Sequence, residues 1–381
     1  MNKYQLLKQK IDEVIDKNLK AKNTTGVVTL VYQKGYEIYR GNAGMADIEA
    51  GIPISRNTLF RFASISKAFT SLAIAALVSQ GKICLTDPVT KWLPYFSPAL
   101  PDGSQPPITI KNLLRHMSGL DYRWAQTENG PYAKEGVSDG LDITAMTLED
   151  NLRRLANAPL AFYPGTNWLY SLAPDVLGAV IAKAYGTDFP TAMLELVLAP
   201  LGISNTHFYI PSELRSEVAG AYYLNKQKML CRMSDDQYLV SSDGRYFHFS
   251  PERVFIETAY PSGGVGLIGT ADDLMKIVEV IRTGNAPFAD KELLLSMSEN
   301  QLRNQEARPG LGFGLGWGIL VNPQRAENTP QSIGTRMWGG VYGSKWFTDP
   351  SLHLSVVSMT TTALDETVSA DIRDAIYSVI R

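Results

Sequence analysis

Residues 60–78 read FRFASISKAFTSLAIAALV, and Gly81 follows shortly after. From Ala68 to Val78 the run is apolar nearly all round, which predicts a helix buried on every side rather than one at the surface. Lys67 stands at the beginning of this helix. Because burying an ammonium group is costly unless the group is paired or neutral, Lys67 needs either a partner or a chemical role.

Ser64 precedes Lys67 by one helical turn, so both side chains are expected on one face of the helix. Ser64 would also lie at the helix N-terminus, where free N–H groups and the helix dipole favour developing negative charge. A serine needs a base within reach to act as a nucleophile, and a desolvated lysine can be that base. The alternative is that Ser64 only caps the helix, because Ser-x-x-Lys is a short pattern that arises by chance in many chains. The burial of Lys67 gives the two hypotheses equal weight, and the rest of the chain decides between them.

Two further segments carry unusual residues. Residues 163–173 read YPGTNWLYSLA, and a Pro-Gly turn followed by aromatic residues and a new helix predicts Tyr170 at a loop-to-helix junction facing a cleft. Residues 337–343 read MWGGVYG, a strand in which the paired glycines Gly339 and Gly340 allow a ligand or another backbone to approach closely.

With these segments together, the chain resembles the penicillin-recognising serine hydrolases, the superfamily of serine β-lactamases and D-Ala-D-Ala peptidases. The resemblance runs in family order from about Leu59 to Pro350, and it adds four blocks to the Ser64–Lys67 helix: LRHMSGL at 114–120, PGT at 164–166, PSGGVGL at 261–267 and IGTADDL at 268–274. One such block would be weak, but the ordered set is strong. The resemblance implies Ser64 as nucleophile, Lys67 and Tyr170 as the proton-transfer pair, and an active site at the seam of two domains.

The chain departs from the β-lactamase pattern at two motifs. The second motif is usually Tyr-x-Asn, but residues 170–172 read Tyr-Ser-Leu, so the asparagine that binds a β-lactam side-chain amide is missing. The third is usually Lys-Thr-Gly, but residues 338–340 read Trp-Gly-Gly, so a neutral aromatic surface replaces a cation. Losing a charge-assisted contact, about 1.5–3 kcal/mol, disfavours anionic substrates and suits neutral esters. The pattern most resembles the β-lactamase-like carboxylesterases of family VIII, and it predicts a small, short-chain neutral ester contacting Trp338, Gly339, Gly340 and Leu172.

The resemblance also implies how the reaction is supported. The backbone N–H groups of Ser64 and Val341 would form the oxyanion hole, and Tyr170 would protonate the leaving alcohol and activate the hydrolytic water. No metal ion or organic cofactor is called for. Lys345 is the one nearby cation that would weaken the neutral-ester hypothesis if it entered the cleft, but its position after Gly343 predicts a solvated lysine at a turn.

Two alternatives stay open. The chain could instead be a β-lactamase, a D-amino-acid peptidase or an acyltransferase of the same superfamily, and weak β-lactam turnover could accompany ester hydrolysis. A non-catalytic ligand-binding or sensor domain on this fold is the other alternative. The presence of Ser64, Lys67 and Tyr170 together weighs against it.

Other patterns suggest chemistry that their surroundings do not support. Residues 136–140 fit the Gly-x-Ser-x-Gly nucleophile elbow, but the polar, turn-rich flank before them predicts Ser138 in a surface loop. Residues 310–318 imitate a glycine-rich nucleotide loop without its strand-loop-helix unit, and they predict a kinked sheet strand instead. The four histidines show no pairing that suggests zinc or a Ser-His relay, and they are expected in core, turn or surface roles: His116, His207, His248 and His353.

The order of the expected elements predicts an α+β fold. A central antiparallel sheet flanked by terminal helices would occupy residues 1–85 and 200–381, and a mainly helical inserted domain would occupy 86–199. The sheet would contain a hairpin and three later strands, at 26–41, 336–342, 345–348 and 352–360, with terminal helices at 1–20 and 366–380. The helical domain would contain the apolar-periodic segments 110–114, 148–155, 173–185 and 191–198.

Composition excludes several classes of protein. The 381 residues are 45% hydrophobic and 19% charged, as in an ordinary globular protein. A formal net charge of -2, without a basic stripe, argues against a nucleic-acid partner. There is no apolar run of membrane-spanning length, no sign of an obligate protein partner, and no secretory h-region in residues 1–20. Cys84 and Cys231 have neither disulfide-framework nor zinc-ligand spacing, so we expect free thiols and a cytoplasmic protein.

Overall fold

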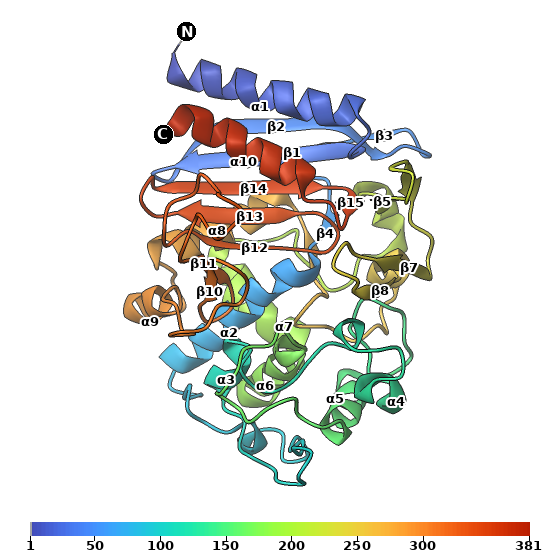
Figure 1. Cartoon of the computed structure of the whole chain (residues 1–381), viewed down its shortest axis with the longest axis vertical. Coiled ribbons are helices and arrows are strands. Elements are labelled where there is room, and N and C mark those ends of the chain that lie inside the picture. The colour runs from blue at the N-terminus through green and yellow to red at the C-terminus, as the bar shows by residue number, and fades with distance from the viewer. Residues whose placement is uncertain (1) are drawn as a thin grey trace.

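The computed structural model describes residues 2–381, and its centre is one antiparallel sheet of eight strands (Figure 1). The predicted hairpin is present, with a turn at Lys34 and Gly35, both in the left-handed region. Strand β1 pairs on its other side with β14, so strands from the two ends of the chain lie next to each other. In spatial order the strands are β10 (Leu311–Phe313), β11 (Gly318–Leu320), β12 (Arg336–Gly339), β13 (Lys345–Asp349), β14 (Leu354–Thr360), β1 (Gly26–Gln33), β2 (Tyr36–Asp47) and β3 (Ile52–Pro53).

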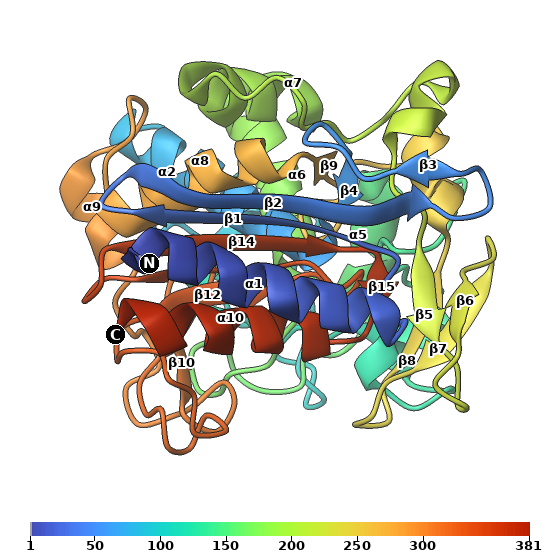
Figure 2. The ribbon, with the colours of Figure 1, turned by 90° about the horizontal axis from the view of Figure 1, so that it is seen from above.

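Both terminal helices lie on the same face of this sheet. Helices α1 (Lys3–Lys20) and α10 (Thr367–Ile380) run side by side across it, as Figure 2 shows. Their apolar stripes pack on the alternate strand residues Val27 and Val31. The residues between these, such as Val28 and Leu30, face the opposite core, which α2 (Ser66–Ser79) and α8 (Ala271–Thr283) cover. The α+β fold with a central antiparallel sheet flanked by terminal helices is confirmed.

Helix α2 connects the sheet to a group of helices beneath it in Figure 1. Four of the predicted helical segments are present, and the last one begins earlier because Asp188 caps it by accepting a hydrogen bond from the Thr191 amide at 2.8 Å. The domain boundaries at 86 and 199 stay a prediction. The helices are α3 (Ile110–Leu114), α4 (Pro131–Glu135), α5 (Leu148–Asn157), α6 (Ala173–Tyr185) and α7 (Phe189–Met193), and α9 (Lys291–Ser296) lies near the C-terminal ends of α2 and α8.

The remaining strands form short ribbons at one end of the sheet. One ribbon, β7 (Gln237–Val240) with β8 (Tyr246–Phe249), is a hairpin whose tip reaches the main cavity of the molecule. The others are β5 (Tyr222–Leu224), β6 (Leu230–Arg232) and β15 (Thr362–Ala363) in one small sheet, and β4 (Phe60–Arg61) with β9 (Ile268–Gly269) in another. Among residues 2–381, no helix combines the length and the apolar character needed to cross a membrane.

Glycine-rich residues 310–318 differ from their prediction. They form two strands, β10 and β11, joined by a tight turn rather than one kinked strand. Gly316 in this turn has φ +126°, and a Cβ there would lie 2.3 Å from the Ser71 side chain. Glycine at position 316 therefore allows this turn to pack closely against α2. The sequence pattern alone did not distinguish such a turn between two strands from a kinked strand.

Candidate active site

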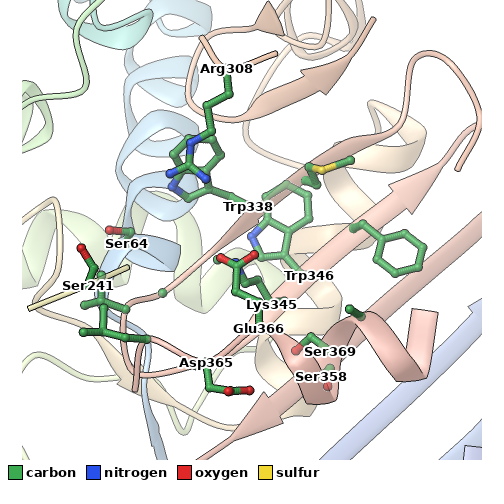
Figure 3. A pocket seen from close by; sticks show the side chains of 18 of the residues that line it. Ser64, Ser241, Arg308, Trp338, Lys345, Trp346, Ser358, Asp365, Glu366 and Ser369 are labelled. Atoms are coloured by element: carbon green, nitrogen blue, oxygen red, sulfur yellow. The ribbon is translucent and has the colours of Figure 1, made fainter. Parts of the chain in front are cut away.

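A cavity of about 670 Å³ lies between the sheet and the helices, and Figure 3 shows part of its wall. Its lining brings together segments that are far apart in the sequence. They include the start of α2, the loop before α6, the end of β12 and the β7–β8 hairpin. The residues that carry the chemical argument are Ser64, Tyr122, Trp124, Tyr170, Trp338 and Gly340.

Ser64 lies in a short 3₁₀ turn, Ala63–Ile65, directly before α2. Ala63 has φ +44°, a left-handed conformation that costs energy for any residue with a Cβ. The surrounding sheet holds it there, because the Phe62 amide donates to the Leu267 carbonyl at 2.9 Å. Ser64 is 7% exposed, so its hydroxyl meets the cavity while its backbone is held in place.

Lys67 is 1% exposed, and its ammonium group faces Ser64. The Nζ atom donates to Ser64 Oγ at 3.0 Å and to the Gly264 carbonyl at 2.8 Å. It also lies 4.8 Å from the centre of the Tyr170 ring. These partners explain how Lys67 can be buried, because its nitrogen is hydrogen-bonded and lies within proton-transfer distance of the Ser64 hydroxyl.

Tyr170 stands at the loop before α6, as predicted, and lines the cavity. Its hydroxyl oxygen accepts a hydrogen bond from Trp338 Nε1 at 3.1 Å. Since the indole N–H can only donate, the Tyr170 proton is free to point elsewhere. The ring of Tyr170 therefore lies between a fixed donor on β12 and the ammonium group of Lys67.

Two polar residues beside Lys67 were missed by sequence reasoning. Asp175, in the first turn of α6, accepts from Ser262 Oγ at 2.7 Å and from the Gly264 amide at 2.8 Å. It thereby holds the loop whose carbonyl contacts Lys67. Burial raises the pKa of Asp175, although these two hydrogen bonds and the charge of Lys67 act in the opposite direction. The feature of the sequence that indicated this role is a polar residue, Asp175, in the first turn of a largely apolar helix.

Tyr122 is the second missed residue. Its ring centre lies 5.5 Å from Lys67 Nζ, and its buried hydroxyl has no hydrogen-bond partner among the described residues. Burial, together with the nearby Tyr170 and Asp175, raises the pKa of Tyr122 well above its ordinary value. Tyr122 is therefore a neutral phenol at the base of the cavity. Its place just after the block 114–120 was the available signal.

The end of β12 lies directly against the turn that carries Ser64. A Cβ on Gly340 would lie 2.2 Å from the Phe62 carbonyl oxygen and 3.4 Å from the Ala63 Cβ. The next amide, Val341 N–H, donates to no other backbone group of residues 2–381. Contact between the two segments needs a glycine at this position, and it leaves the Val341 amide free beside Ser64.

A pair of variants tests this contact. We expect Gly340→Ala to lower kcat by about 10²-fold, because the added methyl group would push the end of β12 away from the turn that carries Ser64 and so misplace the groups around the nucleophile. Gly339→Ala is the matched control. There the new Cβ meets only the flexible Lys345 side chain, at 2.4 Å from its Cδ, so kcat should fall less than in Gly340→Ala, and a change in KM would report the substrate contact expected of Gly339. Equal kcat values for the two variants in an ester assay would contradict the close approach at Gly340.

Lys345 and Leu172 differ from their predictions. Lys345 is not at a turn but in β13 opposite Gly339, and its Nζ forms an ion pair with Glu366 at the start of α10. Figure 3 shows the two side chains together, away from Ser64. Leu172 is 1% exposed and belongs to the core, so the prediction that it contacts substrate is wrong. The start of α6 turns it inward, where an apolar side chain is favoured.

Ser138 is also placed differently from its prediction. It is 2% exposed rather than in a surface loop. Its Oγ accepts from the Gly140 amide at 3.0 Å and from the Tyr260 hydroxyl at 3.2 Å, and it donates to Asp142. The polar side chains of this loop are tolerated inside the fold because they form hydrogen bonds with one another and with neighbouring groups. Helix α4 and not a strand precedes it, so it is not a nucleophile elbow.

No group of three or more His, Cys, Asp or Glu side chains suited to a metal ion occurs among residues 2–381. Cys84 and Cys231 are both free thiols, as expected.

The fold and the cavity define a serine hydrolase scaffold of the penicillin-recognising class, with a Ser-x-x-Lys helix at the junction of sheet and helices. The chain belongs to the Beta-lactamase family, whose model matches residues 11–379. The resemblance inferred from the motifs is thereby confirmed.

Individual relatives agree with this assignment. The chain is 42% identical over 379 residues to Esterase EstB of Burkholderia gladioli, covering 98% of this chain and 95% of that protein. The solved structure of EstCE1, a hydrolase with promiscuous acyltransferase activity, is 39% identical with a TM-score of 0.94, covering 98% of this chain and 99% of that one. An octameric penicillin-binding protein homologue from Pyrococcus abyssi shares the fold, with a TM-score of 0.73 at 21% identity over 96% of this chain and 75% of that one.

Proposed function

We propose that this chain is a serine carboxylesterase that hydrolyses small, neutral, short-chain esters through an acyl-enzyme on Ser64. The observation that carries the proposal is the buried Lys67 Nζ, 3.0 Å from Ser64 Oγ, at the wall of the main cavity. The similarity to an esterase over nearly the whole chain supports it. The presence of Ser64, Lys67 and Tyr170 together weighs against a non-catalytic sensor.

Each proton has a place to go. Ser64 Oγ attacks the ester carbonyl while its proton passes to the pair formed by Lys67 and Tyr170, which accepts it in the form in which one of the two is deprotonated, as the Lys67 amine or the Tyr170 phenolate. The amides of Ser64 and Val341 stabilise the negative charge that develops on the carbonyl oxygen. Tyr170 returns the proton to the leaving alcohol, which departs and leaves the acyl group on Ser64. A water molecule then gives a proton to the same pair and attacks the acyl carbon. The bond from that carbon to Ser64 Oγ breaks, the pair returns the proton to Ser64 Oγ, and the carboxylic acid leaves.

The cavity wall supports a neutral substrate. Trp338 offers an aromatic edge beside Ser64 where related enzymes hold a cation, and Lys345 is neutralised by Glu366. Arg308 lies 6.0 Å from the centre of the Trp338 ring, but it is exposed at the rim of the cavity. A hydrated guanidinium group there attracts a carboxylate weakly, roughly 0–1 kcal/mol. Short neutral esters therefore match the wall better than anionic β-lactams.

An assay panel tests this assignment. We expect kcat/KM for p-nitrophenyl acetate and butyrate to exceed that for nitrocefin by roughly 10²-fold or more, and to fall for long-chain esters. Labelling by a fluorophosphonate probe separates an enzyme from a sensor domain. An enzyme that is labelled but prefers nitrocefin would refute the neutral-ester proposal and leave the nucleophile assignment intact.

Trp338→Lys changes the charge of the wall directly. It should lower kcat/KM for p-nitrophenyl butyrate and raise it for nitrocefin by about tenfold, because a cation would pair with the carboxylate. Trp338→Phe is the neutral control and should not improve nitrocefin turnover. Lys345→Ala should leave the preference unchanged, since its ammonium group already pairs with Glu366. If the wild type prefers β-lactams and Lys345→Ala removes that preference, the substrate proposal is wrong.

A further inference from the structure

Two sequence blocks are joined by hydrogen bonds around Tyr170. The Leu169 amide donates to the His116 carbonyl at 2.9 Å, and the Ser171 amide donates to His116 Nδ1 at 3.2 Å. A third bond, from the Gly165 amide to the Met117 carbonyl at 2.7 Å, joins the same two segments further along. The residues immediately before and after Tyr170 are thus both held by one histidine.

The imidazole ring of His116 also packs against the phenol ring of Tyr170. The ring centres are 4.7 Å apart, and His116 is 1% exposed. On its other sides the imidazole contacts Phe313 edge-on at 5.2 Å and Trp168 at 6.3 Å. The plane of the Tyr170 ring is therefore fixed by packing against a cluster of aromatic side chains to which the His116 imidazole belongs.

The hydrogen bonds fix the tautomer of His116. A backbone N–H can only donate, so Nδ1 carries a lone pair and Nε2 carries the proton. Ser171 Oγ lies 3.1 Å from the same Nδ1 and accepts from the Ala173 amide at 3.4 Å, which links the imidazole to the first residue of α6. Burial and the positive charge of Lys67 hold the pKa of His116 well below its ordinary value, so the ring stays neutral.

The backbone of His116 is held in an unfavourable conformation. Its φ is +54°, a left-handed value that is uncommon for residues with a Cβ and that asparagine also adopts. The conformation turns the carbonyl toward Leu169 and the side chain toward Ser171, so that one residue contacts both sides of Tyr170. Such strain persists only where the surrounding contacts determine it, as they do here.

We infer that neutral His116 is the positioning residue for Tyr170, holding its backbone on both sides and its ring plane against Trp338. His116 makes no contact with Ser64 and takes no proton in the reaction. The inference rests on the proposed role of Tyr170 in proton transfer. It assigns a function to a histidine for which sequence reasoning expected only a core, turn or surface role.

Two variants separate the hydrogen bonds from the packing. His116→Phe keeps the ring and loses the acceptor, whereas His116→Asn loses the ring, keeps an acceptor oxygen near the Nδ1 position and tolerates the positive φ. We expect His116→Phe to lower kcat by roughly 10- to 100-fold with KM within about twofold, and His116→Asn to retain kcat within about fivefold. The opposite order, or equal losses in both variants, would overturn the inference.

A double variant shows whether the effect acts through Tyr170. His116→Phe should cause no further loss of kcat when added to Tyr170→Phe, because the hydroxyl that it positions is already absent. A further loss of the same factor would mean that His116 acts independently of Tyr170. If Tyr170→Phe alone has wild-type kcat, it is the proposed role of Tyr170 that fails, and that result is distinct from a failure at His116.

Nitrogen NMR gives a test that does not need a folded His116→Phe variant. With 4 histidines in the chain, the signals of the wild-type protein can be assigned by the one that His116→Asn removes. We expect that histidine to show a protonated Nε2 and an unprotonated Nδ1 between about pH 5 and pH 8. An Nδ1–H tautomer, or a titration within that range, would overturn the inference.

Discussion

Replacing Ser64 by alanine will abolish both ester hydrolysis and covalent labelling by a fluorophosphonate probe. We expect kcat to fall by roughly 10⁴-fold or more, because the acyl-enzyme cannot form without the hydroxyl. The protein should stay folded, since Ser64 Oγ donates no hydrogen bond that the surrounding core needs. Ester turnover and probe incorporation measured on the same preparation, together with a thermal melt, check all three expectations.

Ser138→Ala is the matched control, because Ser138 is also buried and stands in a motif that imitates a nucleophile elbow. Its kcat should stay within about twofold of wild type. Its melting temperature should fall, because Tyr260 and Gly140 lose a partner, at a cost of about 1–3 kcal/mol. If Ser138→Ala were inactive and unlabelled while Ser64→Ala was active, the assignment of the nucleophile would fail.

Removing either half of the proton-transfer pair should have the next largest effect. Lys67→Ala and Tyr170→Phe should each lower kcat by more than the ~10²-fold typical of one acid–base group, because the two groups act as a unit on Ser64. The double variant should be little worse than either single one. Single-turnover kinetics with p-nitrophenyl butyrate would measure the acylation step directly.

The control for this pair is Tyr260→Phe, which removes a buried tyrosine hydroxyl that hydrogen-bonds Ser138 and Asn151 instead of facing the cavity. Its kcat should remain close to that of wild type. If the losses from Lys67→Ala and Tyr170→Phe multiply in the double variant, the two groups act in separate steps and the shared proton relay is refuted.

Those parts of the fold that depend on local pattern were predictable from the sequence. The all-apolar run after Lys67 predicted a buried helix, and the two strand-like runs on either side of Gln33–Gly35 predicted a hairpin, because each pattern lies within a short stretch of sequence. The proximity of Ser64 to Lys67 was predictable for the same reason, since one helical turn separates them.

Features that depend on distant segments were not predictable in this way. Asp175 comes from α6 and Tyr122 from a loop far from it in the sequence, and only tertiary packing brings them to Lys67. Ser138 was predicted at the surface because its neighbours are polar, whereas the fold pairs those polar groups with one another inside. The inward turn of Leu172 likewise depends on how α6 packs, which the motif comparison could not show.

The pairing of β1 with β14 has a consequence for how the protein is made. Val27 opposes Thr360, so the central sheet joins two strands that lie very far apart in the sequence. Contacts of such high sequence separation form slowly, because the entropy of closing the loop is lost before the pairing compensates it. Until then the distant segments that line the cavity around Ser64 are not held together. We therefore expect catalytic competence to arise only once β12 and its neighbouring strands have joined the sheet, because the end of β12 lies against the turn that carries Ser64.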